Sequence, residues 1–154
     1  MKKKILLILL SFIFFSANLA VRAGEGTGVG LSLGVPTGLN FKPWLTPQMA
    51  MNVNFGLNPL NKWTYMNLDV LYHLKIFYRA PLYTGAGIKF EINGNSKRTD
   101  NINAGLRLIA GDELFFGSSF SIYLEGAYIF QFLPFTLNPG WNAVFGIRYY
   151  LSKS

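Results

Sequence analysis

Apolar and polar residues alternate along most of the chain, and turn-forming residues interrupt this alternation at regular intervals. Alternation with a period of two indicates β-strands whose two faces meet different surroundings. The interruptions contain Gly, Pro, Asn or Ser in combinations that form turns. The pattern predicts eight strands, at residues 27–35, 38–45, 49–57, 64–74, 82–92, 102–110, 120–130 and 141–151.

The two faces of the predicted strands differ in composition. One face is apolar and bears no charge, as at Phe120, Ile122 and Leu124, whereas the other is rich in Gly and Asn and bears every charged residue of the strands. The strand lengths match the roughly 9 to 11 residues that a tilted strand needs to cross a bilayer. Because a closed barrel satisfies its backbone hydrogen bonds within lipid, we expect an all-β fold, a closed eight-stranded antiparallel up-and-down transmembrane β-barrel.

Period-two alternation also fits a soluble lipocalin-like barrel, with its apolar face inside. A solvated outer wall is usually rich in Lys and Glu, whereas the polar face here carries mainly Gly and Asn. In lipid, that inverted register would point Arg107 and Arg148 outward, at a cost of roughly 2–4 kcal/mol each near the midplane. We therefore expect the apolar face outside, against lipid.

The inward positions carry charges of both signs. The interior of an eight-stranded barrel is only wide enough for side chains to fill it, and isolated charges there cost several kcal/mol each. We expect these groups to pair across the lumen as a polar plug; a lining for a small solute channel is the alternative, although a conducting pore calls for more strands. The expected interior network consists of Lys42, Asp69, His73, Lys89, Glu91, Arg107, Glu125 and Arg148.

The N-terminus has the pattern of a secretory signal peptide. Three lysines precede an apolar run that ends before small residues around Ala23. We expect residues 1–23 to be cleaved, with cleavage after Ala20 as the alternative, and residues 24–154 to form one barrel domain. Removing four basic residues with the peptide leaves 10 against 7 acidic ones, so the net charge falls from +7 to +3. A nucleic-acid partner is therefore not expected.

The composition narrows the chemistry further. The chain contains no cysteine, which excludes disulfides, thiol nucleophiles and thiolate metal sites. Charged residues make up 14% of the chain, below the roughly 25% of soluble domains, while aromatic residues reach 16%. Both values favour a chain that contacts lipid. No cofactor is expected, and no cluster of His, Asp and Glu has the spacing of a metal site.

The last predicted strand resembles the terminal strand by which outer-membrane barrels are recognised for assembly. Gly146 is followed at three and five residues by Tyr149 and Leu151. The resemblance implies that the barrel-assembly machinery is a partner of the chain.

Several segments together resemble a family of small bacterial outer-membrane β-barrel proteins of unassigned function. The resemblance implies an OmpA- or OmpX-like barrel without a second domain, in the bacterial outer membrane, and it implies no activity. The segments that carry it are Gly34-Val35-Pro36-Thr37-Gly38-Leu39, Lys42, Trp44-Leu45, Asp69, Tyr72-His73, Tyr83-Thr84-Gly85-Ala86-Gly87, Leu124-Glu125 and Gly146-Ile147-Arg148-Tyr149-Tyr150.

Some eight-stranded outer-membrane barrels modify lipids, so a deacylase or acyltransferase is an alternative function. Such enzymes need a base beside a nucleophile, usually a histidine. The single histidine, His73, falls near the predicted periplasmic end, away from surface lipopolysaccharide. We therefore expect no catalytic residues and no enzymatic activity.

The predicted topology places one clearly polar and basic loop at the cell surface. Asn95, Lys97, Arg98 and Asp100 in that loop are candidate contacts for an extracellular ligand or host surface. The sequence thus favours a small integral outer-membrane barrel with a structural or surface-binding, adhesin-like role. Outer-membrane lipid is its expected surrounding, and a monomer its expected state.

Overall fold

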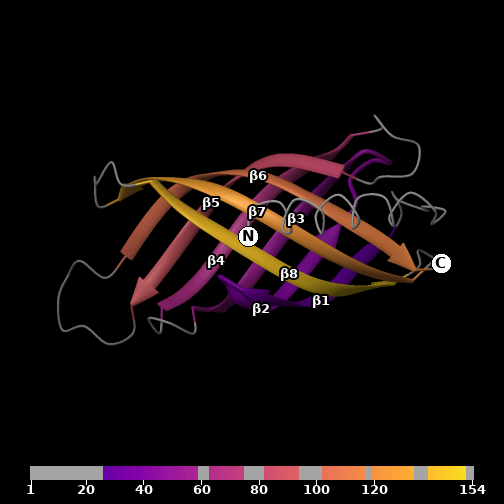
Figure 1. The fold of residues 1–154 in the computed structure, drawn as a ribbon, viewed down its shortest axis with the longest axis horizontal. Helices are drawn as coiled ribbons and strands as arrows, with labels where there is room; N and C mark the ends of the chain where they lie inside the picture. The colour runs from indigo at the N-terminus through magenta and orange to yellow at the C-terminus, as the bar shows by residue number, and fades with distance from the viewer. Residues whose placement is uncertain are drawn as a thin grey trace, which may run out of the picture.

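A computed structural model describes residues 26–58, 63–74, 82–93, 102–116, 119–133 and 139–151. They form a closed barrel in which neighbouring strands are antiparallel and β8 returns to pair with β1 (Figure 1). The predicted eight-stranded up-and-down architecture is therefore confirmed. The strands are β1 (Thr27–Gly34), β2 (Thr37–Pro43), β3 (Met49–Leu57), β4 (Trp63–His73), β5 (Leu82–Asn93), β6 (Ile102–Phe116), β7 (Phe120–Leu133) and β8 (Pro139–Leu151).

The two ends of the barrel differ in where the chain begins and ends. We call the end at which β1 begins and β8 finishes the terminal end, marked C in Figure 1, and the opposite end the far end. The predicted signal peptide, residues 1–23, lies outside the described residues. Within the described part of the chain, no helix is long and apolar enough to cross a membrane.

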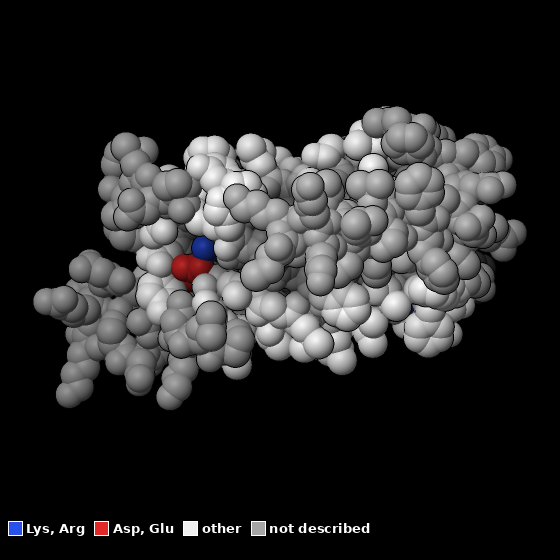
Figure 2. All heavy atoms as spheres, in the orientation of Figure 1, with Lys and Arg blue, Asp and Glu red and all other residues white. Residues whose placement is uncertain are grey.

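The outward face of the barrel is apolar and the inward face polar. Leu33 on β1 is 62% exposed and Ile147 on β8 is 48% exposed, whereas the neighbouring Arg148 is only 1% exposed. The part of the wall that is described and visible in Figure 2 is mostly free of charge, and red and blue atoms gather at one end. The apolar face therefore lies on the outside, as the alternation predicts.

Inward glycines make room for large polar side chains. Gly87 on β5 pairs with Asp69 on β4 and with Arg107 on β6, so the three residues form one row across the sheet. A Cβ added at Gly87 would lie 2.1 Å from an Asp69 carboxylate oxygen. Gly146 on β8 likewise lies under the Tyr123 ring, 2.4 Å from where its Cβ would be. The cramped lumen thus explains why glycine occupies the polar face.

The predicted end of the sixth strand was wrong. The sequence places a turn at Gly111-Asp112, but β6 continues to Phe116 and pairs with β7 along this whole stretch. Gly111 is needed for packing, because a Cβ there would lie 2.4 Å from the Tyr83 ring. The extension brings Glu113 into the lumen, where its side chain is fully buried.

The strands differ in length around the barrel. β1 and β2 contain 8 and 7 residues, whereas β6, β7 and β8 contain 15, 14 and 13. In Figure 1 the strands β1 and β2 stop short of the left edge of the barrel, which is the far end. One side of the wall is therefore lower than the other.

Candidate functional site

The lumen contains equal numbers of buried cations and carboxylates among the described residues. Each of these residues is no more than 7% exposed as a whole, and each contacts a group of opposite charge. The buried charges therefore sum to zero. The cations are Lys42, Lys89, Arg107 and Arg148, and the carboxylates are Asp69, Glu91, Glu113 and Glu125.

Arg107 joins two carboxylates in the middle of the lumen. Its Nη1 donates to both oxygens of Asp69 at 3.1 and 2.9 Å, and its Nη2 donates to Glu125 at 3.0 Å. Glu125 also accepts a hydrogen bond from the Tyr83 hydroxyl at 3.1 Å. Ion pairs in such dry surroundings are tolerated when hydrogen bonds satisfy the remaining polar atoms, so this cluster can fill the middle of the barrel.

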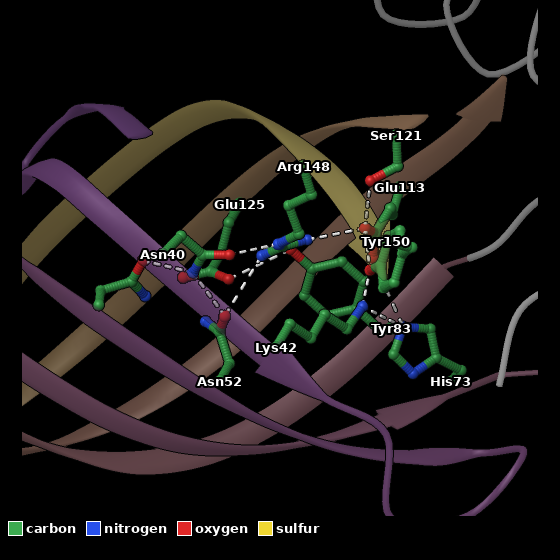
Figure 3. A network of polar contacts seen from close by, with 11 residues as sticks. Asn40, Lys42, Asn52, His73, Tyr83, Glu113, Ser121, Glu125, Arg148 and Tyr150 are labelled. Carbon is green, nitrogen blue, oxygen red and sulfur yellow. Dashed lines mark hydrogen bonds and ion pairs between the residues drawn. The ribbon is translucent and has the colours of Figure 1, made fainter. Parts of the chain in front are cut away.

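Glu113 is the centre of a second cluster, near the terminal end (Figure 3). Its carboxylate accepts hydrogen bonds from Lys42, from the Ser121 hydroxyl at 2.6 Å and from the Tyr150 hydroxyl at 2.7 Å. It also forms an ion pair with Arg148 at 2.9 Å. One carboxylate thereby connects β6 with β2, β7 and β8, and its contact with Lys42 on β2 joins residues 71 positions apart.

Arg148 links the Glu113 cluster to polar amides on the opposite side of the lumen. Its guanidinium donates to the side-chain oxygens of Asn40 and Asn52, the latter at 3.3 Å. It also lies over the Tyr123 ring, 3.5 Å from the ring centroid. These contacts continue from β2 to the neighbouring strand β3, because the Asn40 amide donates to Asn52 at 2.7 Å.

A separate pair lies toward the far end. Lys89 donates to Glu91, two residues away on the same strand, and Glu91 accepts a further hydrogen bond from Asn103 at 3.1 Å. The side chains of the pair are each 8% exposed, unlike the fully buried groups deeper in the lumen. This pair is therefore local in sequence and closer to solvent.

His73 lies at the terminal end beside the Glu113 cluster. Its Nε2 is 2.9 Å from the Lys42 Nζ, and its ring packs against Trp44 and Tyr83 with centroids 4.3 and 5.3 Å away. The hydroxyl of Ser121 donates to Glu113 rather than to this ring. The arrangement thus resembles a packed polar cluster rather than a histidine base positioned on a nucleophile.

The remaining predicted site residues fall in two groups. The loop residues Asn95, Lys97, Arg98 and Asp100 lie outside the described residues. In the proposed assembly signal, Gly146 faces the lumen, whereas Tyr149 and Leu151 are exposed on the outer wall. The ring of Tyr149 packs edge-on against Phe120, with centroids 5.0 Å apart.

Metal chemistry finds no support in the described part of the chain, where no group of three or more His, Cys, Asp or Glu residues could hold a metal ion.

A groove of about 280 Å³ lies on the outer wall, where β8, β1 and β2 meet. Its lining includes the aliphatic side chains of Val29, Leu31, Leu39 and Ile147 and the rings of Phe120 and Tyr149.

Among the described residues, Glu113 is the one buried charged member of the lumen network that the sequence prediction missed. The turn assigned to Gly111-Asp112 removed it from the strand. The alternation of the strand could have identified Glu113, because Arg107, Ile109 and Glu113 occupy alternate positions and all face inward. Extending the alternation past the glycine would have found it.

Comparison with known proteins supports the architecture. No family model matches the chain, and no curated protein matches its sequence. Among solved structures, the chain is similar to the N-terminal β-barrel domain of Pseudomonas aeruginosa OprF, with a TM-score of 0.67 and 13% sequence identity. The similarity covers 84% of this chain and 100% of that domain. At the level of the fold, this chain is a closed eight-stranded barrel similar to that domain.

Proposed function

We propose that the protein is a small bacterial outer-membrane barrel with a structural or surface-binding role and no catalysis. The observation that carries this proposal is the pairing of an exposed apolar wall with a neutral, buried charge network. Lipid would cover the wall, and because the barrel is closed every strand has a hydrogen-bonded neighbour on both sides. On this proposal residues 1–23 direct export, and the terminal end faces the periplasm.

The alternative of a soluble barrel conflicts with the outer surface. Large apolar side chains such as Leu33, Leu151 and Trp141 are 53–76% exposed and lie on adjoining strands. Contiguous exposed apolar surface of this extent marks contact with a partner or a membrane. Membrane lipid fits best here, because exposed apolar residues are found on every strand from β1 to β8.

Refolding tests the proposal directly. Urea-unfolded mature chain should fold into phosphatidylcholine vesicles and then migrate differently on gels when boiled and unboiled. The same chain diluted into buffer without lipid or detergent should aggregate. A monomer that folds in buffer alone would contradict the membrane assignment.

A solute channel is a second reading that can be tested in the same preparation. Because the Arg107 and Glu113 clusters occupy the lumen with paired side chains, we expect no steady conductance in planar bilayers. Discrete, reproducible channel openings from the wild-type chain would overturn the structural role.

A lipid-modifying enzyme is tested by incubation with labelled lipopolysaccharide or phospholipid, with His73→Ala as the control.

Surface binding depends on the polar loop. We propose that Lys97 and Arg98 supply its attraction for an anionic partner. Replacing both with Gln should weaken the attachment of barrel-bearing vesicles to anionic surfaces such as heparin, whereas Lys42, in the lumen, should contribute nothing. Unchanged attachment of the double variant would remove the loop from the proposal.

A further inference from the structure

The low side of the barrel wall is formed by β1, β2 and β3, and we call its outward face the short wall. β1 pairs with β8 only as far as Gly34 and Val144, whereas β8 extends five residues further, to Pro139. On the other side, β4 and β5 stay paired as far as Trp63 and Asn93. The missing height is therefore at the far end, as Figure 1 shows for β1 and β2.

The difference is large on the scale of a membrane. A strand residue rises about 3.3 Å, and a tilt of about 40° leaves about 2.5 Å of height per residue. The 7 and 8 residues of β2 and β1 then span about 20 Å, and the 13 to 15 residues of β6 to β8 span about 35 Å. The apolar band of an outer-membrane barrel is about 25 Å tall, so only the long side reaches it.

The short wall remains apolar up to its far edge. Leu33, Leu39 and Leu57 lie at that edge and are 62%, 49% and 57% exposed. They point to lipid, and no polar collar separates them from the turn above. If the bilayer kept its usual thickness here, its apolar layer would cover the turn itself.

The turn between β1 and β2 is tight, and its two central residues, Val35 and Pro36, have apolar side chains, but their backbone carbonyls lie outside the paired strands. Thr37 accepts a hydrogen bond from the Gly34 amide at 3.1 Å and donates to the Gly34 carbonyl at 2.9 Å. Gly34 has a φ of 130°, which side chains rarely adopt. Such a turn belongs at the level of lipid headgroups, because hydrocarbon offers its remaining polar groups no partners.

We propose that the short wall binds membrane lipid in a locally thinned bilayer, with the headgroups of the far-end leaflet drawn down to the β1–β2 turn. A span shorter than the hydrocarbon layer is accommodated by thinning of the bilayer around it. The outer groove at Val29, Leu31 and Leu39 lies on the same wall and gives an acyl chain room to lie there. This inference rests on the proposed membrane function and adds an asymmetric effect on the surrounding lipid.

Two leucines at the same level on opposite walls provide a matched test. The row of paired residues that starts at Leu33 on β1 and runs around the wall through β8 and β7 reaches Asp112 on β6. The stagger of the closed barrel over three strands shifts the level by about four residues toward the far end, which brings Leu108 level with Leu33. Leu108 is 54% exposed against 62% for Leu33, so the two differ mainly in the height of wall around them.

The test uses the absence of cysteine in the chain. Leu33→Cys and Leu108→Cys carry a nitroxide spin label in refolded protein in dioleoylphosphatidylcholine vesicles, and power saturation compares accessibility to oxygen and to a water-soluble nickel chelate. We expect the label at position 33 to be several-fold more accessible to the nickel chelate than the label at 108. Equal burial of both labels in the apolar layer would overturn the proposal.

Charge substitution gives an independent readout. In the same vesicles, Leu108→Arg should lower the urea midpoint clearly, whereas Leu33→Arg should leave it nearly unchanged because its guanidinium reaches the lowered headgroups. Equal decreases in the urea midpoint of the two variants would overturn the proposal of a locally thinned bilayer. Cross-linking that shows a second copy of the chain covering position 33 would also overturn it. If the wild-type chain fails to enter vesicles, the membrane function itself fails, which is a different outcome.

Discussion

The Glu113 cluster and the Lys89–Glu91 pair are both made of buried opposite charges, but they are built differently. Glu113 collects groups from three other strands and is fully buried, and its contact with Lys42 joins residues 71 positions apart. Lys89 and Glu91 are two residues apart, and their side chains are each 8% exposed. The first arrangement holds distant strands together, whereas the second lies on one strand and reaches only the adjacent strands, through Asn103 on β6 and the Tyr65 ring on β4. Burial and sequence separation, more than the count of ion pairs, should decide what each contributes.

The largest expected effect comes from removing the hub of the first cluster. Glu113→Ala leaves Lys42 and Arg148 buried without their carboxylate. Breaking a buried pair in this way costs about 3–5 kcal/mol, so the free energy of unfolding measured by urea titration in vesicles should fall by about that amount. Asp112→Ala, at the next and half-buried position, is the control and should cost far less. Similar losses for the two variants would mean that Glu113 is no hub.

A smaller effect is expected where the lumen is filled rather than charged. Gly87→Ala places a Cβ between Asp69 and Arg107, 2.1 Å from an Asp69 oxygen. Overpacking of this kind costs about 1–3 kcal/mol, and the Asp69–Arg107 pair must shift. Gly126→Ala is the matched control, because the nearest atom there is 3.9 Å away. Equal urea midpoints for the two variants would show that the lumen has more room than its contacts indicate.

The smallest effect should come from the far-end pair. Glu91→Gln removes the charge opposite Lys89 but keeps an acceptor for the Asn103 amide. Because this pair is local in sequence, its side chains are each 8% exposed and the amide of the variant keeps a hydrogen-bonding group, the loss should be about 1 kcal/mol, well below that of Glu113→Ala. A loss as large as that of Glu113→Ala would erase the distinction between the two regions.

The strands and the inward charges were predictable because period-two alternation depends only on which face of the strand points outward and which points into the barrel. The partners of each charge were not, since Arg107 reaches Asp69 and Glu125 through a register that pairing and closure set together. Glu113 was lost because Gly111-Asp112 has the composition of a turn, although this glycine accommodates the Tyr83 ring.

The unequal wall was also missed. Strand ends depend on where pairing stops, and the alternation around residues 35 and 130 gave no sign of a difference in length. Only the pairing shows that β1 ends against Val144 while β8 continues. The alternation along the chain therefore predicted the two faces of the barrel, whereas the hydrogen-bonded register was needed to find the strand ends and the height of each wall.

The contact between Arg148 and Asn40 joins residues 108 positions apart in the chain. It cannot form until β8 has come close to β2. The entropic cost of closing so large a loop is offset only by the contacts of the completed barrel. In the closed barrel Arg148 is 1% exposed and Glu113 is fully buried. Completing the ring therefore also has to remove these two charges from water, which couples the closure of the barrel to the pairing of its charges.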